Sequence, residues 1–362
     1  MTNFPTRIYN VIGLMSGTSL DGLDIAFCRF TVDKNEWSYE IIKAETKPYS
    51  ESWKKAFLSL ETADALTFQQ THSQYGHYLG RVVSDFIVKN GIKVDFVSSH
   101  GHTIFHQPEA GFTAQIGDGA SIYAETNIPV VCDFRTTDIA LGGQGAPLVP
   151  IGDKLLFSNY DACLNLGGIA NISFTKNNEI NAFDISPCNL VFNRIARLHN
   201  IEYDENGNMA ASGNVNDDLL NALNDLDYYH LQTAKSLGKE WIDEVFFSVV
   251  KNHAHINDVD LMATFSAHFA QQIAETINRS NAANILLTGG GAFNTHLINN
   301  IKKLTKAEIK IPDAQTINFK EAIVFALLGA LRVNNFNNAL KSVTGASRDN
   351  IGGALYGDFR NL

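Results

Sequence analysis

The sequence predicts an α/β protein built from two domains. The chain has 362 residues, which is more than one hydrophobic core normally organises. Near residue 17 and again near residue 168, a β-rich run leads into a glycine-containing turn and a returning strand. Helical patterns follow in both halves, so we expect two similar units, each a mixed sheet with helices on its faces.

The first half is expected to begin with a three-stranded meander. Its strands are 8–15, 23–30 and 37–47, and the turn 16–22 joins the first two. A helical pattern over 65–90 ends at Gly91. The rest of this half is expected to contain the strand 95–100, a polar loop, a short helix near 118–126 and the strand 129–134.

The segment 140–147, ALGGQGAP, is interpreted as the linker between the domains, because glycine and proline interrupt regular structure. The first domain is therefore assigned to 1–134 plus 335–362, and the second to 135–334. The second domain is expected to contain the strands 161–168, 169–176, 180–186, 284–289 and 308–312 and the helices 257–279 and 319–333.

Composition restricts the classes of partner. The net charge of −10 argues against a nucleic-acid surface or an anionic membrane as the main partner. No run of 18 apolar residues predicts a membrane span, and the first residues do not resemble a signal peptide. The four cysteines form no CxxC pair, so free thiols in a reducing cytoplasm are expected. We therefore expect a cytoplasmic protein with a small-molecule partner, and leave a homodimer open.

The first candidate site is the loop 15–24, MSGTSLDGLD. Glycine lets a backbone approach phosphate closely, exposed N–H groups bind anions, and Asp21 can hold Mg²⁺. An ordinary tight turn is the alternative, and no Gly-Lys-Ser/Thr follows, so this is not a Walker loop. The nucleotide-binding candidates here are Gly17, Thr18, Ser19, Asp21, Gly22 and Asp24.

Two further glycine-rich loops follow strands in the second half. The loop 165–171 is expected to face phosphate, and the loop 288–294 to leave room for a flat adenosine group. Simple turns are the alternatives, and the second loop lacks the dinucleotide-binding fingerprint. The nucleotide-binding candidates here are Gly167, Gly168, Gly289, Gly290, Gly291 and Asn294, the last of which can also cap a helix.

Asp184 is the candidate general base, because it closes a strand just before a predicted helix. A helix-capping or turn aspartate is the alternative. His100, His102 and His106 lack an acidic or cysteine partner at a metal-binding spacing, so a sugar-binding loop is favoured over a metal site. Arg135, close to Asp133, suits a carboxylate-bearing ligand, with a structural ion pair as the alternative.

These motifs together resemble those of one known family, the anhydro-N-acetylmuramic acid kinases. The resemblance spans nearly the whole chain, and the motifs at 13–24 and 142–150 are its most specific parts. The matching segments are 13–24 (GLMSGTSLDGLD), 99–101 (SHG), 115–118 (QIGD), 133–135 (DFR), 142–150 (GGQGAPLVP), 165–171 (NLGGIAN), 289–294 (GGGAFN), 321–322 (EA) and 344–346 (TGA).

The resemblance implies a two-domain actin/hexokinase-like (ribonuclease H-like) fold, with ATP and Mg²⁺ in an interdomain cleft and the sugar beside them. It implies a reaction in which water opens the 1,6-anhydro ring while ATP phosphorylates O6, giving N-acetylmuramate 6-phosphate and ADP for cell-wall recycling. The family's base maps onto Asp184. The implied substrate-binding residues are His100, His102, Gln115, Asp133, Arg135 and Asn189.

The chain departs from the family pattern beside the base and in the histidine-containing loop. Ile185, Ser186 and Cys188 stand where the family has Thr, Gly and Gly, and His102 stands where Gln is expected. These changes leave the identity of the sugar open. The alternatives are a kinase for another anhydrosugar or a hexose, and a nucleotide-gated regulatory protein that has lost catalysis.

Overall fold

The computed structural model describes residues 6–17, 20–34, 36–177, 179–231 and 235–360. The chain forms two compact units, Met1–Leu156 with Phe319–Leu362, and Phe157–Asn318. The expected domain bounds differ from this division at residues 135–156 and 319–334, which belong to the first unit. The reason is packing, since apolar side chains on both of these segments join a core on the first sheet.

The described part of the first unit is built on a mixed sheet whose strands run in the order β12-β6-β4-β1-β2-β3, with β5 paired to β4. β1, β2 and β3 form the expected antiparallel meander, while β1, β4 and β6 are parallel. The strands are β1 (Arg7–Ser16), β2 (Gly22–Asp33), β3 (Glu36–Pro48), β4 (Phe96–Gln107), β5 (Phe112–Ile116), β6 (Val130–Cys132) and β12 (Ala354–Tyr356).

The second unit repeats this order with its own strands. Its sheet runs β11-β10-β7-β8-β9, in which β7, β8 and β9 are an antiparallel meander and β7, β10 and β11 are parallel. The strands are β7 (Ala162–Leu166), β8 (Ile169–Lys176), β9 (Glu179–Pro187), β10 (Asn284–Thr288) and β11 (Glu308–Lys310). The expected internal repeat is confirmed, and with it the α/β, ribonuclease H-like fold class.

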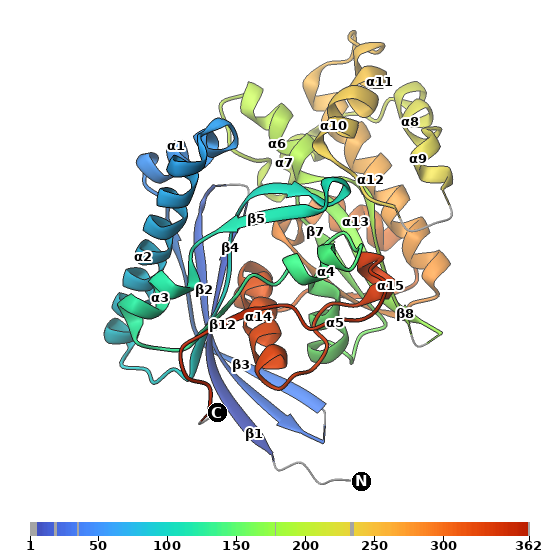
Figure 1. Cartoon of the computed structure of the whole chain (residues 1–362). Helices are drawn as coiled ribbons and strands as arrows, with labels where there is room; N and C mark the ends of the chain where they lie inside the picture. The colour runs from blue at the N-terminus through green and yellow to red at the C-terminus, as the bar shows by residue number, and fades with distance from the viewer. Residues whose placement is uncertain (1–5, 18–19, 35, 178, 232–234, 361–362) are drawn as a thin grey trace. The chain divides into compact units, whose positions relative to one another are not determined.

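Helices cover the two faces of the first sheet (Figure 1). Along β1, Tyr9 and Val11 belong to the core under α14, whereas Ile12 and Leu14 belong to the core under α2, as the two-residue period of a strand requires. The main helices of this unit are α1 (Glu51–Ser59), α2 (Ala65–Asn90), α3 (Gly119–Thr126), α4 (Thr136–Ala140), α5 (Val149–Leu156) and α15 (Lys341–Thr344), together with α14 (Ala314–Val333) from Phe319 onward.

The second unit has one large core around α12. Asn257 caps this helix by accepting from the Asp260 N–H, and Asn281 ends it at φ 57°, the left-handed conformation typical of a helix C-terminus. The other helices are α6 (Asn189–Leu198), α7 (Asn208–Ser212), α8 (Asp217–Asn224), α9 (Asp227–His230), α10 (Lys239–Trp241), α11 (Phe247–Lys251) and α13 (Thr295–Leu304).

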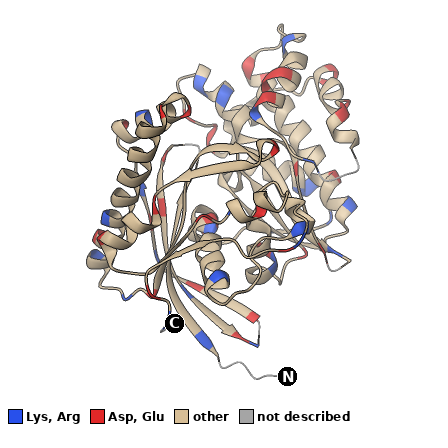
Figure 2. Cartoon of the chain, viewed as in Figure 1, with Lys and Arg blue, Asp and Glu red and all other residues tan. Residues whose placement is uncertain are grey.

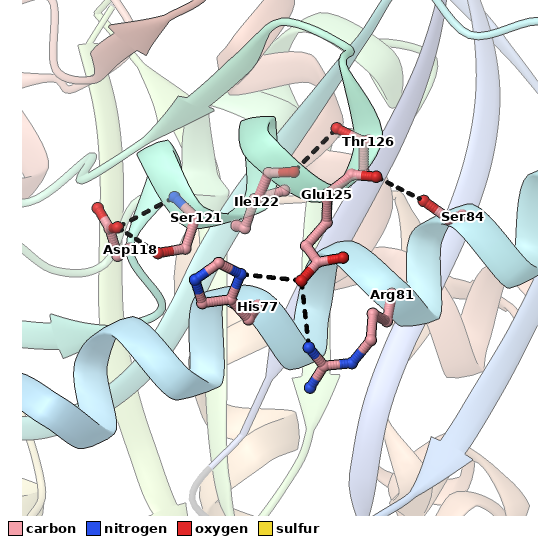
Figure 3. Close-up of polar contacts among 8 residues, drawn as sticks. All are labelled: His77, Arg81, Ser84, Asp118, Ser121, Ile122, Glu125 and Thr126. Carbon is pink, nitrogen blue, oxygen red and sulfur yellow. Dashed lines mark hydrogen bonds and ion pairs between the residues drawn. The ribbon is translucent and has the colours of Figure 1, made fainter.

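α2 and α3 approach each other closely and are joined by polar contacts (Figure 3). A side chain at Gly80 would press on Glu125, so glycine is required for this approach. Glu125 then accepts from Arg81 at 3.2 Å and pairs with His77 at 2.9 Å. These contacts are partly exposed and contribute little stability by themselves, so the packing of the two helices carries most of the association.

Two expectations for the first unit are wrong. The polar loop expected after residue 100 is a continuation of strand β4 to Gln107, because β5 pairs with it and satisfies its backbone groups. The expected linker 140–147 lies inside the first unit, where the buried Asp138 accepts from the Gly145 N–H at 2.8 Å. Burial of this carboxylate fixes the glycine-rich segment as a packed loop.

Acidic and basic residues are interspersed along the helices of both units (Figure 2). The net charge of −10 is therefore distributed and not gathered on one element. All four cysteines are buried free thiols, as expected. Among the described residues, no helix is both long and apolar enough to cross a membrane.

We predict that Asp138→Ala lowers the free energy of unfolding by roughly 2–4 kcal/mol, because it leaves several buried hydrogen-bond donors without an acceptor. Thr344 and Asn350 donate to Asp138 Oδ1 at 2.8 and 2.7 Å, and the Gly145 N–H donates to Oδ2. Urea unfolding followed by circular dichroism measures the change. Asp349→Ala, which removes an exposed carboxylate bonded to the Lys341 N–H, should cost less than ~1 kcal/mol. Equal losses in the two variants would contradict this account.

Candidate functional site

In each unit the predicted site residues gather at one edge of the sheet. Parallel strands end at the same edge, and ligands of open α/β sheets bind outside the carboxyl ends of such strands. In the first unit, β1 ends at Ser16, before Gly17, and β6 ends before Asp133 and Arg135. In the second unit, β7 and β10 end in the two glycine-rich turns.

Two carboxylates, Asp21 and Asp24, lie near each other at the start of β2. Asp21 is exposed, and Gly22 begins β2. Asp24 accepts from Thr46 Oγ1 at 2.6 Å. Desolvation raises the pKa of Asp24, the Thr46 hydroxyl opposes this, and the Asp21 charge adds to the rise. Such a pair of oxygen ligands suits a divalent cation. Thr18 and Ser19, also predicted here, lie outside the described residues.

A buried chain of hydrogen bonds begins at Ser16, the last residue of β1. Ser16 Oγ is 2.8 Å from His102 Nδ1, and the Tyr49 hydroxyl donates to Ser16 Oγ at 2.6 Å. The Tyr49 and Tyr75 hydroxyls are 2.5 Å apart. The His102 ring also stacks on Phe57, with centroids 4.2 Å apart. His102, predicted to bind sugar, is thus a buried neighbour of the first loop.

His100 and Arg135 form a preorganised pair. Arg135 donates from Nε and Nη2 to His100 Nε2 at 3.1 and 2.9 Å, and from Nη1 to the Gly145 carbonyl at 2.6 Å. The other His100 nitrogen is 2.9 Å from the Gly101 carbonyl. Desolvation, with the Arg135 charge, keeps the pKa of His100 well below its usual value. The neutral imidazole therefore orients the guanidinium.

Glu321, at the start of the apolar part of α14, belongs to the same group. The side chain retains exposed surface, and the protein around it still desolvates the carboxyl and raises its pKa. Arg135 opposes this rise and Asp24 adds to it, which shows that the three charges interact. In the sequence, Glu321 stands at the head of an apolar run and in the matching segment 321–322, and no role was predicted for it.

Two other predicted sugar-binding residues lie near this edge of the first unit. Gln115, on β5, donates to Thr113 Oγ1 at 2.7 Å. Asp133 has φ 59°, a conformation that non-glycine residues adopt rarely and often at functional sites. Its carboxylate accepts from Thr136 Oγ1 at 2.5 Å. Both side chains therefore have defined orientations before any ligand is considered.

The two glycine-rich loops of the second unit lie side by side. Thr288 of β10 pairs with Asn165 of β7, so Gly167 and Gly289 follow neighbouring strands. Gly289 has φ 84°, and a side chain there would meet Asn165 and the Leu166 backbone. The structure thus brings together the loops that were predicted separately.

The first turn of α6 closes this glycine cluster. The Asn189 side-chain amide donates to the Leu166 carbonyl at 3.1 Å, and the Leu190 N–H donates to the Gly168 carbonyl at 3.1 Å. Gly290 and Gly291 begin a short 3₁₀ turn. Asn294 ends that turn and caps α13 by accepting from the Leu297 N–H at 3.0 Å, which confirms its predicted capping role.

Asp184 lies on β9, on the same edge as these loops, where it pairs with Asn171 across a register shift. Its Oδ2 accepts from the Leu237 N–H at 2.8 Å, and its carbonyl accepts from the Tyr228 hydroxyl at 2.6 Å. Desolvation raises the pKa of Asp184, and the Leu237 N–H partly opposes this. A carboxylate with a raised pKa is a stronger base.

The residues that depart from the family pattern beside Asp184 face inward. Ile185, Ser186 and Cys188 are 2%, 0% and 0% exposed, and Ile185 and Cys188 belong to the core of the second unit. Their extra bulk therefore fills the protein interior. Sequence reasoning had no signal for this orientation, because the register shift between Ala170 and Asn171 interrupts the alternation of the strand.

We predict that His102→Gln reduces the loss of stability at acidic pH. Burial lowers the pKa of His102 from 6.5 to about 4, so between these values the unfolded chain binds a proton that the folded chain does not. Stability then falls as the pH decreases through this window. Removing the imidazole should reduce that slope by about 1 kcal/mol per pH unit, measured by urea unfolding at pH 4.5–7. An unchanged slope would contradict the assignment.

Comparisons with known proteins identify the family. The family model described as anhydro-N-acetylmuramic acid kinase matches residues 9–358. A protein of that name from Francisella tularensis subsp. novicida is 35% identical, over 92% of this chain and 95% of the relative. The one from Hydrogenovibrio crunogenus is 32% identical, over 98% and 100%. Among solved structures, a ROK family glucokinase from Streptomyces griseus has 12% identity and a TM-score of 0.40, covering 88% of this chain and 98% of that one. The chain belongs to the anhydro-N-acetylmuramic acid kinase family.

Proposed function

We propose that this protein is an ATP-dependent kinase that opens 1,6-anhydro-N-acetylmuramic acid with water and phosphorylates O6. The products are N-acetylmuramate 6-phosphate and ADP, and the reaction serves cell-wall recycling. Family membership supports the reaction class. The observation that carries the proposal is Asp184, a partly desolvated carboxylate at the same sheet edge as the glycine turns.

The chemistry requires a base that acts on water. In an anhydro sugar the bridge occupies both C1 and O6, so there is no 6-hydroxyl to deprotonate. Asp184 would take a proton from water as the water attacks C1, and O6 would leave C1 and accept the phosphoryl group. Desolvation makes the Asp184 carboxylate more basic, which favours this proton transfer.

The phosphates would be held by backbone groups and by a metal ion. Glycine turns expose N–H groups to an anion, and we assign this role to the turns containing Gly17, Gly168 and Gly290. Asp21 and Asp24 fit Mg²⁺ because they are two neighbouring carboxylates. When bound, Mg²⁺ would neutralise charge on the transferring phosphoryl group.

Arg135 is the best candidate for recognising the lactyl carboxylate of the sugar. A guanidinium can pair with a carboxylate through two parallel hydrogen bonds, and His100 with Gly145 already fixes its plane. Gln115, Asp133 and Asn189 would contact the sugar's polar groups. His102 would act through the first loop, because its Nδ1 faces Ser16.

Two further features of the protein remain proposals. The four buried free thiols support a reducing, cytoplasmic location. A homodimer is a prediction that an oligomeric-state measurement in solution would test.

A coupled ADP-release assay tests the proposal. We expect rapid release with 1,6-anhydro-N-acetylmuramic acid, and much slower release with the matched anhydro-N-acetylglucosamine, which lacks the lactyl carboxylate. Levoglucosan and glucose should be poor substrates. Equal rates with and without the lactyl group would contradict the assigned substrate, and preferred turnover of glucose would favour a hexose kinase instead.

We predict that Asp184→Asn retains the fold and ATP binding but lowers turnover by roughly 100-fold or more, the scale expected when a general base is lost. Asp161→Asn is the matched control in the same unit. Asp161 accepts from the Ala283 and Asn284 N–H groups at 2.8 and 2.9 Å, beside the start of β7 and β10, at the opposite edge of the sheet. Near-normal turnover of Asp184→Asn with intact binding would reject the base.

A further inference from the structure

We propose that Tyr228 and Leu237 are positioning residues for the base. They belong to the segment 226–241, of which residues 226–231 and 235–241 are described. The proposal rests on the proposed function, because it concerns the residue assigned as the base. It goes beyond that function by assigning the control of the base to a segment more than 40 residues away along the chain.

The segment holds Asp184 at three separate atoms. The Leu237 N–H donates to carboxylate Oδ2 at 2.8 Å, and the Tyr228 hydroxyl donates to the Asp184 carbonyl at 2.6 Å. The Asp184 N–H in turn donates to the Lys235 carbonyl at 3.0 Å. The backbone and the carboxylate are thus fixed by the same segment, so the carboxylate cannot rotate without losing a hydrogen bond.

This arrangement makes the two carboxylate oxygens different. Oδ2 is occupied by the Leu237 N–H, and among the described residues no hydrogen bond to Oδ1 is found. Because the Leu237 N–H already occupies Oδ2, we assign the acceptance of the water proton to Oδ1. A hydrogen bond that orients a base in this way raises the fraction of productive geometries.

The segment is itself anchored in the second unit. Tyr228, Tyr229 and Leu237 are buried together, and Trp241 packs on Tyr228 with ring centroids 5.2 Å apart. Behind them, the Tyr229 hydroxyl lies 2.9 Å from Nε2 of His268, a fully buried residue of α12. The aromatic cluster thus connects Asp184 to the main core.

Charged and titratable groups of the segment also lie close to Tyr228 and Asp184. Lys235 donates to the Tyr228 carbonyl at 2.9 Å, and its ammonium lies 4.4 Å from the centre of the Tyr228 ring. Desolvation raises the pKa of the Tyr228 hydroxyl above its usual value, and the Asp184 charge adds to this rise. The hydroxyl therefore keeps its proton and remains a hydrogen-bond donor. The pKa of Asp184 depends on desolvation and on the Leu237 N–H.

Tyr228→Phe tests the proposal, because it removes one hydroxyl and keeps the ring. The Leu237 N–H lowers the pKa of Asp184. Loss of the Tyr228 hydrogen bond should weaken this Leu237 contact, so the pKa of Asp184 should rise. We expect the acid limb of the kcat profile to move to higher pH, and kcat at neutral pH to fall on the order of tenfold with KM for ATP unchanged. Carbon-13 NMR of labelled Asp carboxyls, with the Asp184 signal identified by its absence in Asp184→Asn, measures the pKa without relying on activity.

Tyr229→Phe is the matched control, since it removes the neighbouring hydroxyl, which faces His268 instead of Asp184. It should lower the thermal midpoint and leave kcat, its pH profile and the Asp184 titration unchanged. Equal loss of kcat in both variants, or an unaltered Asp184 titration in Tyr228→Phe, would overturn the proposal. Normal turnover of Asp184→Asn would reject the proposed base separately, while the NMR titration would still test whether Tyr228 positions Asp184.

Discussion

Parallel pairing between central strands is the constraint on which the rest of the structure depends. β1 pairs in parallel with β4, and β7 pairs in parallel with β10, so the carboxyl ends of each pair meet at one edge. Backbone N–H groups that the sheet leaves unpaired are available there. The antiparallel meanders return β9 to the same edge of the second sheet. The glycine turns and Asp184 therefore share an edge, although up to about 120 residues separate them in sequence.

The close approach of the α14 backbone to β1 positions the charged residues of the first unit. A side chain at Gly13 would overlap the Ala322 carbonyl oxygen, so only glycine lets α14 lie this close to β1. Ala322 is adjacent to Glu321, which interacts with Arg135 and Asp24. The neighbouring Lys320 pairs with Asp153 of α5 at 2.7 Å, and both side chains are nearly buried. One glycine in a strand thus helps to fix the position of a charged group at the edge of the sheet.

The sequence predicted the strands and glycine turns well, because their signals are local. Alternating apolar residues and adjacent glycines are visible within a few positions, and the repeat of strand, turn and strand was confirmed. The extension of β4 to Gln107 was missed because it depends on pairing with β5, and the packed loop at 140–147 was missed because it depends on the buried Asp138. Tyr228 and Leu237 carry no local signal, since their relation to Asp184 exists only after folding. Arg135 was selected from its place just before the expected linker and Asp184 from its place at a strand end, and their roles in the reaction stay predictions.

The central claim is that Asp184 activates water and not a sugar hydroxyl. The most direct measurement is the reaction of 1,6-anhydro-N-acetylmuramic acid with ATP in ¹⁸O-labelled water, followed by prompt mass spectrometry of the phosphorylated sugar before its anomeric hydroxyl exchanges. The account predicts one labelled oxygen at C1 and none in the bridge between C6 and phosphorus. Label in the C6–O–P bridge, or its absence from C1 alongside rapid phosphorylation of an ordinary hexose, would contradict the account.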